Sequence, residues 1–109
     1  AKLEKRFGNQ LSGGAQQVLA IARAIVGNAD LLLLDEPSEG LSPLIIKGLG
    51  ERLVALKDRG VAILICEQNA RFAFAISSRG YILDNGRVYH HGPVDQLRES
   101  EEVKSCLAI

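Results

Sequence analysis

The stretch Leu31-Leu32-Leu33-Leu34-Asp35-Glu36-Pro37 decides the expected fold of this chain. Four consecutive leucines without polar alternation are typical of a strand that is buried on both faces of a parallel sheet. Two carboxylates follow at the point where this strand ends. Because open α/β folds bind their ligands at the carboxyl ends of parallel strands, the stretch predicts a buried strand that leads directly into a candidate site.

A helical pattern lies on each side of this strand. Before it, Gly27-Asn28 ends a segment whose apolar residues recur at helical spacing, at Ala15, Val18, Leu19, Ala22, Ile25 and Val26. After it, Ser42-Pro43 predicts a helix start with Ser42 as the N-cap, and Arg59-Gly60 predicts the end of that helix. The buried stripe of the second helix is expected at Ile46, Leu49, Leu53 and Leu56.

The rest of the chain continues this alternation. Val61 to Cys66 is a second apolar run and predicts another buried strand. A short helix is expected from Asn69 to Ser77, with its inner face at Phe72, Ala73 and Ile76. Asn85-Gly86 then predicts a β-hairpin, and Val94 to Ile109 is expected to be helical in pieces. Together these elements predict one α/β layered domain over residues 1–109.

Composition limits the classes of function. The chain has 109 residues, with 13 Lys plus Arg balanced by 13 Asp plus Glu, and 5% aromatic residues. This balance argues against non-specific binding to nucleic acid, which needs clustered positive charge. The apolar runs are too short to span a membrane, which needs roughly 20 residues, so no direct membrane insertion is expected. Cys66 is expected to be a buried thiol and Cys106 a tail thiol, which suits a cytoplasmic protein.

Three short stretches carry residues that could bind a ligand or take part in a reaction. Ser12-Gly13-Gly14 precedes a helix, where backbone N–H groups and the positive end of the helix dipole can receive a phosphate, although plain helix capping also explains it. Asp35 and Glu36 could hold Mg²⁺ and orient a water that attacks a phosphate, or could be two solvated carboxylates. Glu67-Gln68-Asn69 could contact a phosphate through an amide, or form a turn capped by Asn69.

Two adjacent histidines lie in the second strand of the expected hairpin. Neighbouring residues of a strand point to opposite faces, so His90 and His91 are not expected to chelate one metal ion. We expect one of them to be solvated and the other to be partly packed.

The order and spacing of these stretches resemble the ATPase subunits of ABC transporters. The stretch from Leu11 to Gly14 matches the signature loop of that family, and Leu31 to Asp35 matches its Walker B strand. Glu36-Pro37-Ser38-Glu39-Gly40-Leu41 and Glu67-Gln68-Asn69-Ala70 are most similar to the subunits of branched-chain amino acid or urea importers. Related ATPase heads of DNA-repair proteins also pair such motifs, but they carry long coiled coils, and residues 1–10 show no heptads.

This resemblance implies a function and a set of roles. It implies ATP and Mg²⁺ as cofactors, with Asp35 as metal ligand, Glu36 as the catalytic carboxylate and Gln68 at the position of the switch histidine. The nucleotide-binding residues it implies are Ser12, Gly13, Gly14 and Gln16. It further implies a second ATPase subunit and membrane-spanning permease subunits as partners, a location at the cytoplasmic face of the membrane, and transport of a solute, expected to be branched-chain amino acids.

The chain also departs from the family pattern. It contains no G-x-x-x-x-G-K-[ST] phosphate loop, and Ala15, Ser42 and Gln68 replace the usual residues. We therefore expect a partial P-loop NTPase (RecA-like) fold, the carboxyl-terminal portion without the phosphate-loop half, which is inactive alone. The strands Val61 to Cys66 and Tyr81 to Asp84 would then pair directly, or the chain would self-associate as a homo-oligomer. The alternative is a non-catalytic gene fragment that folds as an oligomer.

Overall fold

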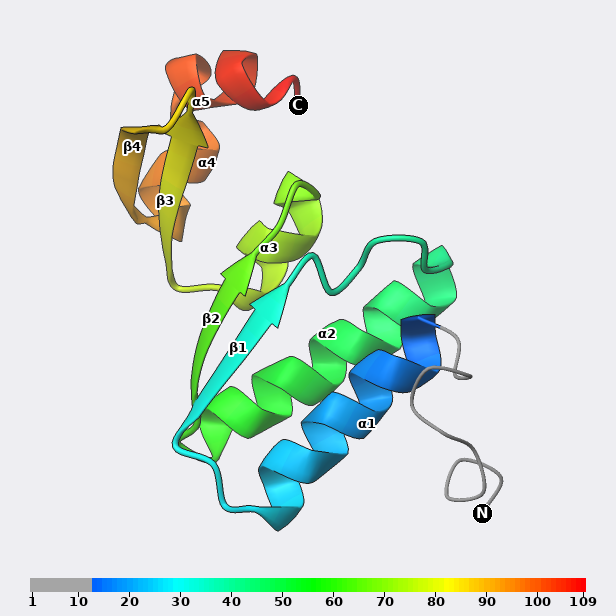
Figure 1. Ribbon diagram of the computed structural model, residues 1–109. Coiled ribbons are helices and arrows are strands. Elements are labelled where there is room, and N and C mark those ends of the chain that lie inside the picture. The colour runs from blue at the N-terminus through cyan, green and yellow to red at the C-terminus, as the bar shows by residue number, and fades with distance from the viewer. Residues whose placement is uncertain (1–12) are drawn as a thin grey trace. The chain divides into compact units, whose positions relative to one another are not determined.

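A computed structural model describes residues 13–109 of the chain, which divide into two compact units (Figure 1). The first unit ends at Glu67 and the second begins at Gln68. The first unit contains the helices α1 (Gly13–Val26) and α2 (Pro43–Asp58) and the strands β1 (Leu31–Asp35) and β2 (Ala62–Cys66). The alternation of helix and strand predicted for this part of the sequence is therefore confirmed.

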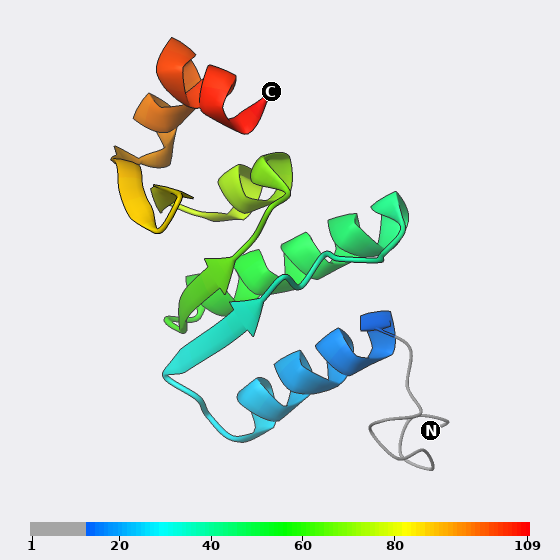
Figure 2. The same ribbon diagram turned by 45° about the horizontal axis from the view of Figure 1, so that its top comes forward.

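The two strands of the first unit form a parallel pair. Leu31 lies opposite Ala62, and the register runs without a shift to Asp35 opposite Cys66. The helix α2 connects the strands and packs against β2, and α1 packs against α2. Both helices run antiparallel to the strands, so that the helices begin at the end of the unit where the strands finish (Figure 2). This is the arrangement in which open α/β folds place their sites.

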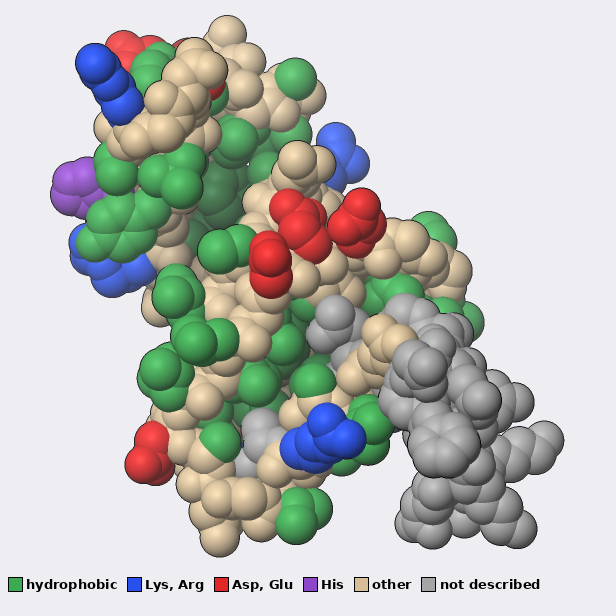
Figure 3. Space-filling view, in the orientation of Figure 1, with side chains coloured by type: hydrophobic (Ala, Val, Ile, Leu, Met, Phe, Trp, Pro, Cys, Tyr) green, Lys and Arg blue, Asp and Glu red, His purple; other side chains and the backbone are tan. Residues whose placement is uncertain are grey.

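Only one face of this sheet is buried among the described residues. Leu32 and Leu34 are buried, but Leu31 is 54% and Leu33 64% exposed, and Leu64 on β2 is 60% exposed. Hydrophobic side chains are accordingly visible over β1 and β2 in the space-filling view (Figure 3). The prediction of burial on both faces is thus wrong here, because alternate side chains point to opposite faces and α2 packs against one of them. Cys66 shares the uncovered face, so its expected burial is wrong too.

The helix α2 begins and ends as its sequence predicts. Ser42 is the N-cap, whose Oγ accepts a hydrogen bond from the Ile45 N–H at 3.4 Å, and Pro43 is the first helical residue. After the last residue of the helix, Gly60 adopts a φ of +96°, which suits a residue without a Cβ. Leu49, Leu53 and Leu56 are buried as expected, and Ile46 is half-buried.

The second unit is a hairpin packed against short helices. It contains α3 (Ala70–Ile76), β3 (Arg79–Asp84), β4 (Arg87–Pro93), α4 (Val94–Glu99) and α5 (Glu101–Leu107). The antiparallel strands turn at Asn85 and Gly86, whose φ values of +50° and +77° fit the predicted Asn-Gly hairpin. The core consists of Ile82, Leu97 and Val103, with Phe74 and Leu107 packed against it. The expected hairpin and helical tail are confirmed.

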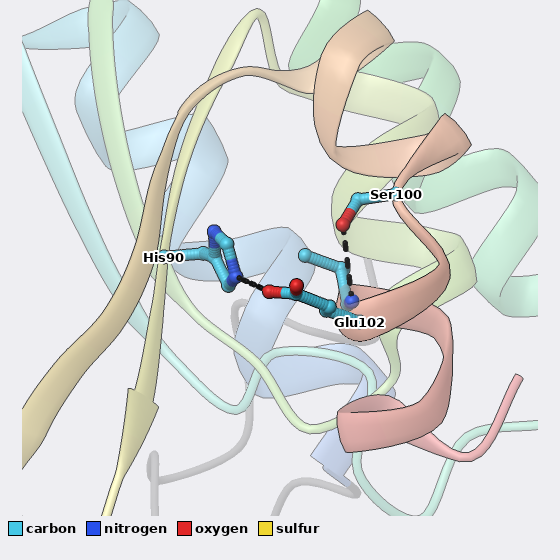
Figure 4. Close-up of polar contacts among 4 residues, drawn as sticks. His90, Ser100 and Glu102 are labelled. Atoms are coloured by element: carbon cyan, nitrogen blue, oxygen red, sulfur yellow. Dashed lines mark hydrogen bonds and ion pairs between the residues drawn. The ribbon is translucent and has the colours of Figure 1, made fainter.

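The two histidines of β4 have different surroundings. The His90 Nε2 lies 3.0 Å from the Oε2 of Glu102, which belongs to α5 (Figure 4). Ser100 is the N-cap of this helix, and its hydroxyl accepts a hydrogen bond from the Val103 N–H. The exposed His91 stacks on Tyr81, with ring centroids 5.3 Å apart. This confirms that one histidine is partly packed and the other solvated.

The strands pair within each unit. The strand β2 pairs with β1 and β3 pairs with β4, in two two-stranded sheets, and the direct pairing of β2 with β3 stays a prediction. The short Asn-Gly turn makes β4 the nearest partner of β3. Within residues 13–109, no helix is long and apolar enough to cross a membrane. The single domain expected over residues 1–109 stays a prediction.

Candidate functional site

Two adjacent carboxylates lie at the carboxyl end of β1. Asp35 is the last residue of the strand and is exposed. Glu36 is half-buried, and its N–H donates a hydrogen bond of 2.7 Å to the carbonyl of Cys66, which extends the parallel ladder by one bond. Glu36 has a φ of +50°, a conformation that residues with a Cβ rarely adopt. A backbone held in this way at a strand end is typical of a functional position.

The turn after Glu36 is fastened to the end of β2. Ser38 is 6% exposed, and its N–H and its hydroxyl both donate to the Glu67 Oε1, at 2.8 and 2.5 Å. This contact is not predicted from the sequence, in which Glu67 is singled out only as part of the stretch Glu67-Gln68-Asn69. The register of the two strands could have indicated it, since Glu67 follows Cys66 directly and Cys66 lies opposite Asp35.

Gln68 is exposed and follows Glu67 as the first residue of the second unit. The next residue, Asn69, is the N-cap of α3, because its Oδ1 accepts a hydrogen bond of 3.1 Å from the Phe72 N–H. The capping role expected for Asn69 is thus confirmed. The role of Gln68 as a phosphate contact stays a prediction.

The candidate anion-binding loop lies at the start of α1. Gly13 and Gly14 are the first two residues of this helix, Gln16 is exposed on it, and Ser12 lies outside the described residues. The first turn of α1 contains no acidic side chain, so the positive end of the helix dipole is not neutralised by a carboxylate of its own. This arrangement suits an anionic ligand, but Gly13 and Gly14 lie on a different element from Asp35 and Glu36.

The described carboxylates suit a metal ion that takes most of its ligands from a bound phosphate group and from water. Within residues 13–109, no group of three His, Cys, Asp or Glu side chains could enclose a metal ion. Mg²⁺ commonly takes one or two carboxylates and fills its other positions with phosphate oxygens and waters. The exposed carboxylate of Asp35 fits that mode. A hollow in the second unit contains none of the candidate residues and is lined by Asp84, Tyr89, Glu101, Glu102, Ser105 and Cys106.

Comparison with known proteins connects these residues to a family. The family model described as ABC transporter matches residues 1–39, which include the candidate anion loop, Asp35 and Glu36. The chain is 47% identical over 105 residues to BraG, a high-affinity branched-chain amino acid transport ATP-binding protein of Pseudomonas aeruginosa. It is 41% identical over 107 residues to LivF of Archaeoglobus fulgidus, described as a probable branched-chain amino acid transport ATP-binding protein. Each match covers 96% of this chain and 45% of the relative, so the chain spans about half the length of these proteins.

Solved structures give the same result for the fold. The ATP-binding subunit of an ABC transporter matches with a TM-score of 0.74 and 31% identity, over 99% of this chain and 50% of that one. A dimeric ATP-binding cassette bound to ADP and phosphate matches with a TM-score of 0.67 and 30% identity, over 79% of this chain and 37% of that one. The α/β fold with a parallel sheet and a carboxyl-terminal hairpin is therefore that of an ATP-binding cassette, in part.

Proposed function

Since the sequence and fold of this chain match part of ABC transporter ATP-binding proteins, we propose that it is their carboxyl-terminal portion and contributes the hydrolytic residues of an importer ATPase subunit. The observation that carries this proposal is the 47% identity to BraG over 105 residues. The solute proposed is a branched-chain amino acid, the substrate class in the names of BraG and LivF.

The carboxylates at the end of β1 have separate roles in this proposal. Asp35 is exposed and would ligate Mg²⁺, which supplies neutralisation of the charge that develops on the phosphate oxygens. Glu36 would orient the attacking water and accept its proton. Its left-handed backbone, held by the hydrogen bond to Cys66, ends the extended path of the strand at this residue. Gln68 would contact the terminal phosphate.

The residues at the start of α1 would act on a second nucleotide. Ser12, Gly13, Gly14 and Gln16 would meet the phosphates bound by a second ATPase subunit, through backbone N–H groups at a helix start. The dimeric cassette among the similar structures supports such pairing. We further propose permease subunits as partners and a place at the cytoplasmic face of the membrane through those subunits, in keeping with the importer relatives.

The proposal is tested by supplying the part of the relative that the chain does not match. A fusion of the amino-terminal portion of BraG to this chain should hydrolyse ATP, whereas this chain alone should not, because its 109 residues contain no phosphate-loop motif. In the fusion, Glu36→Gln should lower ATP turnover by about 100-fold or more, the range typical of a lost general base. Glu51→Gln, on an exposed position of α2, is the matched control and should leave turnover unchanged. A folded fusion that hydrolyses ATP equally well with Glu36→Gln would refute the proposal.

The second candidate, a non-catalytic piece that folds as an oligomer, is favoured by the uncovered apolar face of β1 and β2. Under that function, the fusion would fold and remain without ATP turnover, while the chain alone would form a defined oligomer. ATP turnover of the fusion therefore distinguishes the two candidates.

A further inference from the structure

We propose that Glu67 is a positioning residue for Glu36, acting through Ser38. This inference rests on the proposed function of Glu36 and names a residue that the sequence motifs do not assign. The Glu67 Oε1 accepts two hydrogen bonds from Ser38, which lies two residues beyond Glu36 in the same turn. The turn is thus held on both sides of Pro37, by the last residue of β2 before it and by the residue that follows β2 after it.

The first attachment is the backbone bond from Glu36 to Cys66. At 2.7 Å it ties the residue with the left-handed φ to the last residue of β2. A left-handed conformation costs an L-residue about 1–2 kcal/mol, so it persists only where the surroundings enforce it. Within the turn the Glu39 N–H also donates to the Glu36 carbonyl, at 3.2 Å, but that bond does not connect the residues after Glu36 to the strand end, which is why a second attachment matters.

The second attachment is the bond pair between Ser38 and Glu67. Ser38 and Pro37 are buried, and Glu67 is half-buried at the residue after β2. Both donors of Ser38 meet one carboxylate oxygen, and a charged acceptor makes such bonds stronger than neutral ones. Removing the acceptor would leave a buried N–H and a buried hydroxyl without this partner, a costly state that the turn can relieve only by moving.

The two attachments together fix the path of the chain from Glu36 to Ser38. The Glu67 carboxylate is engaged with the turn, so we assign it no direct contact with the substrate. A base that is displaced by about 1 Å can lose about 100-fold in rate, so a residue that holds the turn affects kcat without touching the reacting atoms.

The first test measures amide hydrogen exchange in this chain. Glu67→Ala should speed exchange of the Ser38 and Glu36 amides by about tenfold or more, the loss expected for a hydrogen bond to a charged group. Glu67→Gln keeps an oxygen acceptor at the same place and should stay close to the native rates. Glu51→Ala on the exposed side of α2 is the control. Exchange in Glu67→Ala at the native rate at both amides would overturn the inference.

The second test measures ATP turnover in the fusion with the BraG portion. Glu67→Ala should lower kcat by about tenfold or more with KM for ATP unchanged, and Glu67→Gln should restore most of it. Loss that is equal in the Ala and Gln variants, or that appears in KM, would contradict positioning through an acceptor. A fusion insensitive to Glu36→Gln would refute the proposed function instead, and the exchange test would still decide whether Glu67 holds the turn. If Glu67→Ala fails to fold, Ser38→Ala removes one of the two bonds and should give the same direction of change.

Discussion

At the scale of single residues, burial separates the leucines that hold the first unit together from those that do not. Leu53 on α2 is 1% exposed, whereas Leu33 on β1 is 64% exposed, although both belong to apolar patterns in the sequence. A buried leucine contributes through the apolar area it removes from water and through the close packing around it. An exposed leucine in the isolated chain contributes little of either.

The two leucines therefore make a matched pair of variants. Leu53→Ala should lower the free energy of unfolding of the first unit by about 2–5 kcal/mol, the range for a cavity left by a buried leucine. At protein concentrations low enough to keep the chain monomeric, Leu33→Ala should change it by less than about 0.5 kcal/mol, as is usual for surface positions. The free energy of unfolding of each variant is measured by amide hydrogen exchange in α2 at increasing urea concentrations. Equal losses in the two variants would mean that Leu33 is covered in solution.

Single residues also show how far the sequence predicts the candidate site. Asp35, Glu36 and the N-caps Ser42 and Asn69 could be placed, because each follows from a local rule about strand ends or helix starts. The bond between Ser38 and Glu67 could not, since it joins residues 29 positions apart and depends on the register of the two strands.

At the scale of elements, two glycines show how the same substitution has opposite effects. Gly86 closes the hairpin with a φ of +77°, while Gly48 lies within α2 without a positive φ. A Cβ added at either position meets no atom within 4 Å, so crowding plays no part in the comparison. The difference lies in backbone conformation alone.

Alanine at these two positions should accordingly shift stability in opposite directions. Gly86→Ala should destabilise the β3–β4 pair by about 1–2 kcal/mol, the cost of a left-handed conformation for an L-residue. Gly48→Ala should stabilise α2 by about 0.5–1 kcal/mol, because glycine loses more conformational freedom in a helix. Amide exchange in β3 and in α2 reports each effect separately. Stabilisation of the hairpin by Gly86→Ala would contradict the observed turn.

The prediction of elements succeeded where the signal is local and was wrong where it depends on neighbours. The Asn85-Gly86 turn, the Pro43 helix start and the helical tail follow from short-range preferences, and all are present. Burial of β1 on both faces depends on what else packs against the strand. An apolar run indicates that a strand is suited to burial, but it does not predict which element covers the strand.

At the scale of the whole molecule, the exposed face of the parallel pair is the feature with the clearest consequence. Leu33 and Leu64 lie opposite each other in the register, and both are more than half exposed. Contiguous exposed apolar side chains on a sheet are typical of a surface that associates. Within the described part of the chain, β1 and β2 each pair with one neighbour only, and strand edges that lack a partner add to this tendency.

We therefore expect the isolated chain to self-associate as its concentration rises. The double variant Leu33→Lys with Leu64→Glu places opposite charges on facing strand positions, so it should keep the strand pair and abolish association. Leu44→Lys, at an 80% exposed position of α2, is the control and should leave association intact. Sedimentation velocity over a range of concentrations measures the outcome. A native chain that stays monomeric throughout would contradict this expectation.

The central claim is that this chain carries the hydrolytic carboxylate of an ABC ATPase at Glu36. It is tested most directly by ATP turnover of the fusion with the BraG portion, compared with the same fusion carrying Glu36→Gln. We expect turnover in the first, a decrease of about 100-fold or more in the second, and ATP binding retained in both, because the substitution removes a general base and no part of the phosphate-loop portion. Equal turnover in the two fusions would contradict the claim.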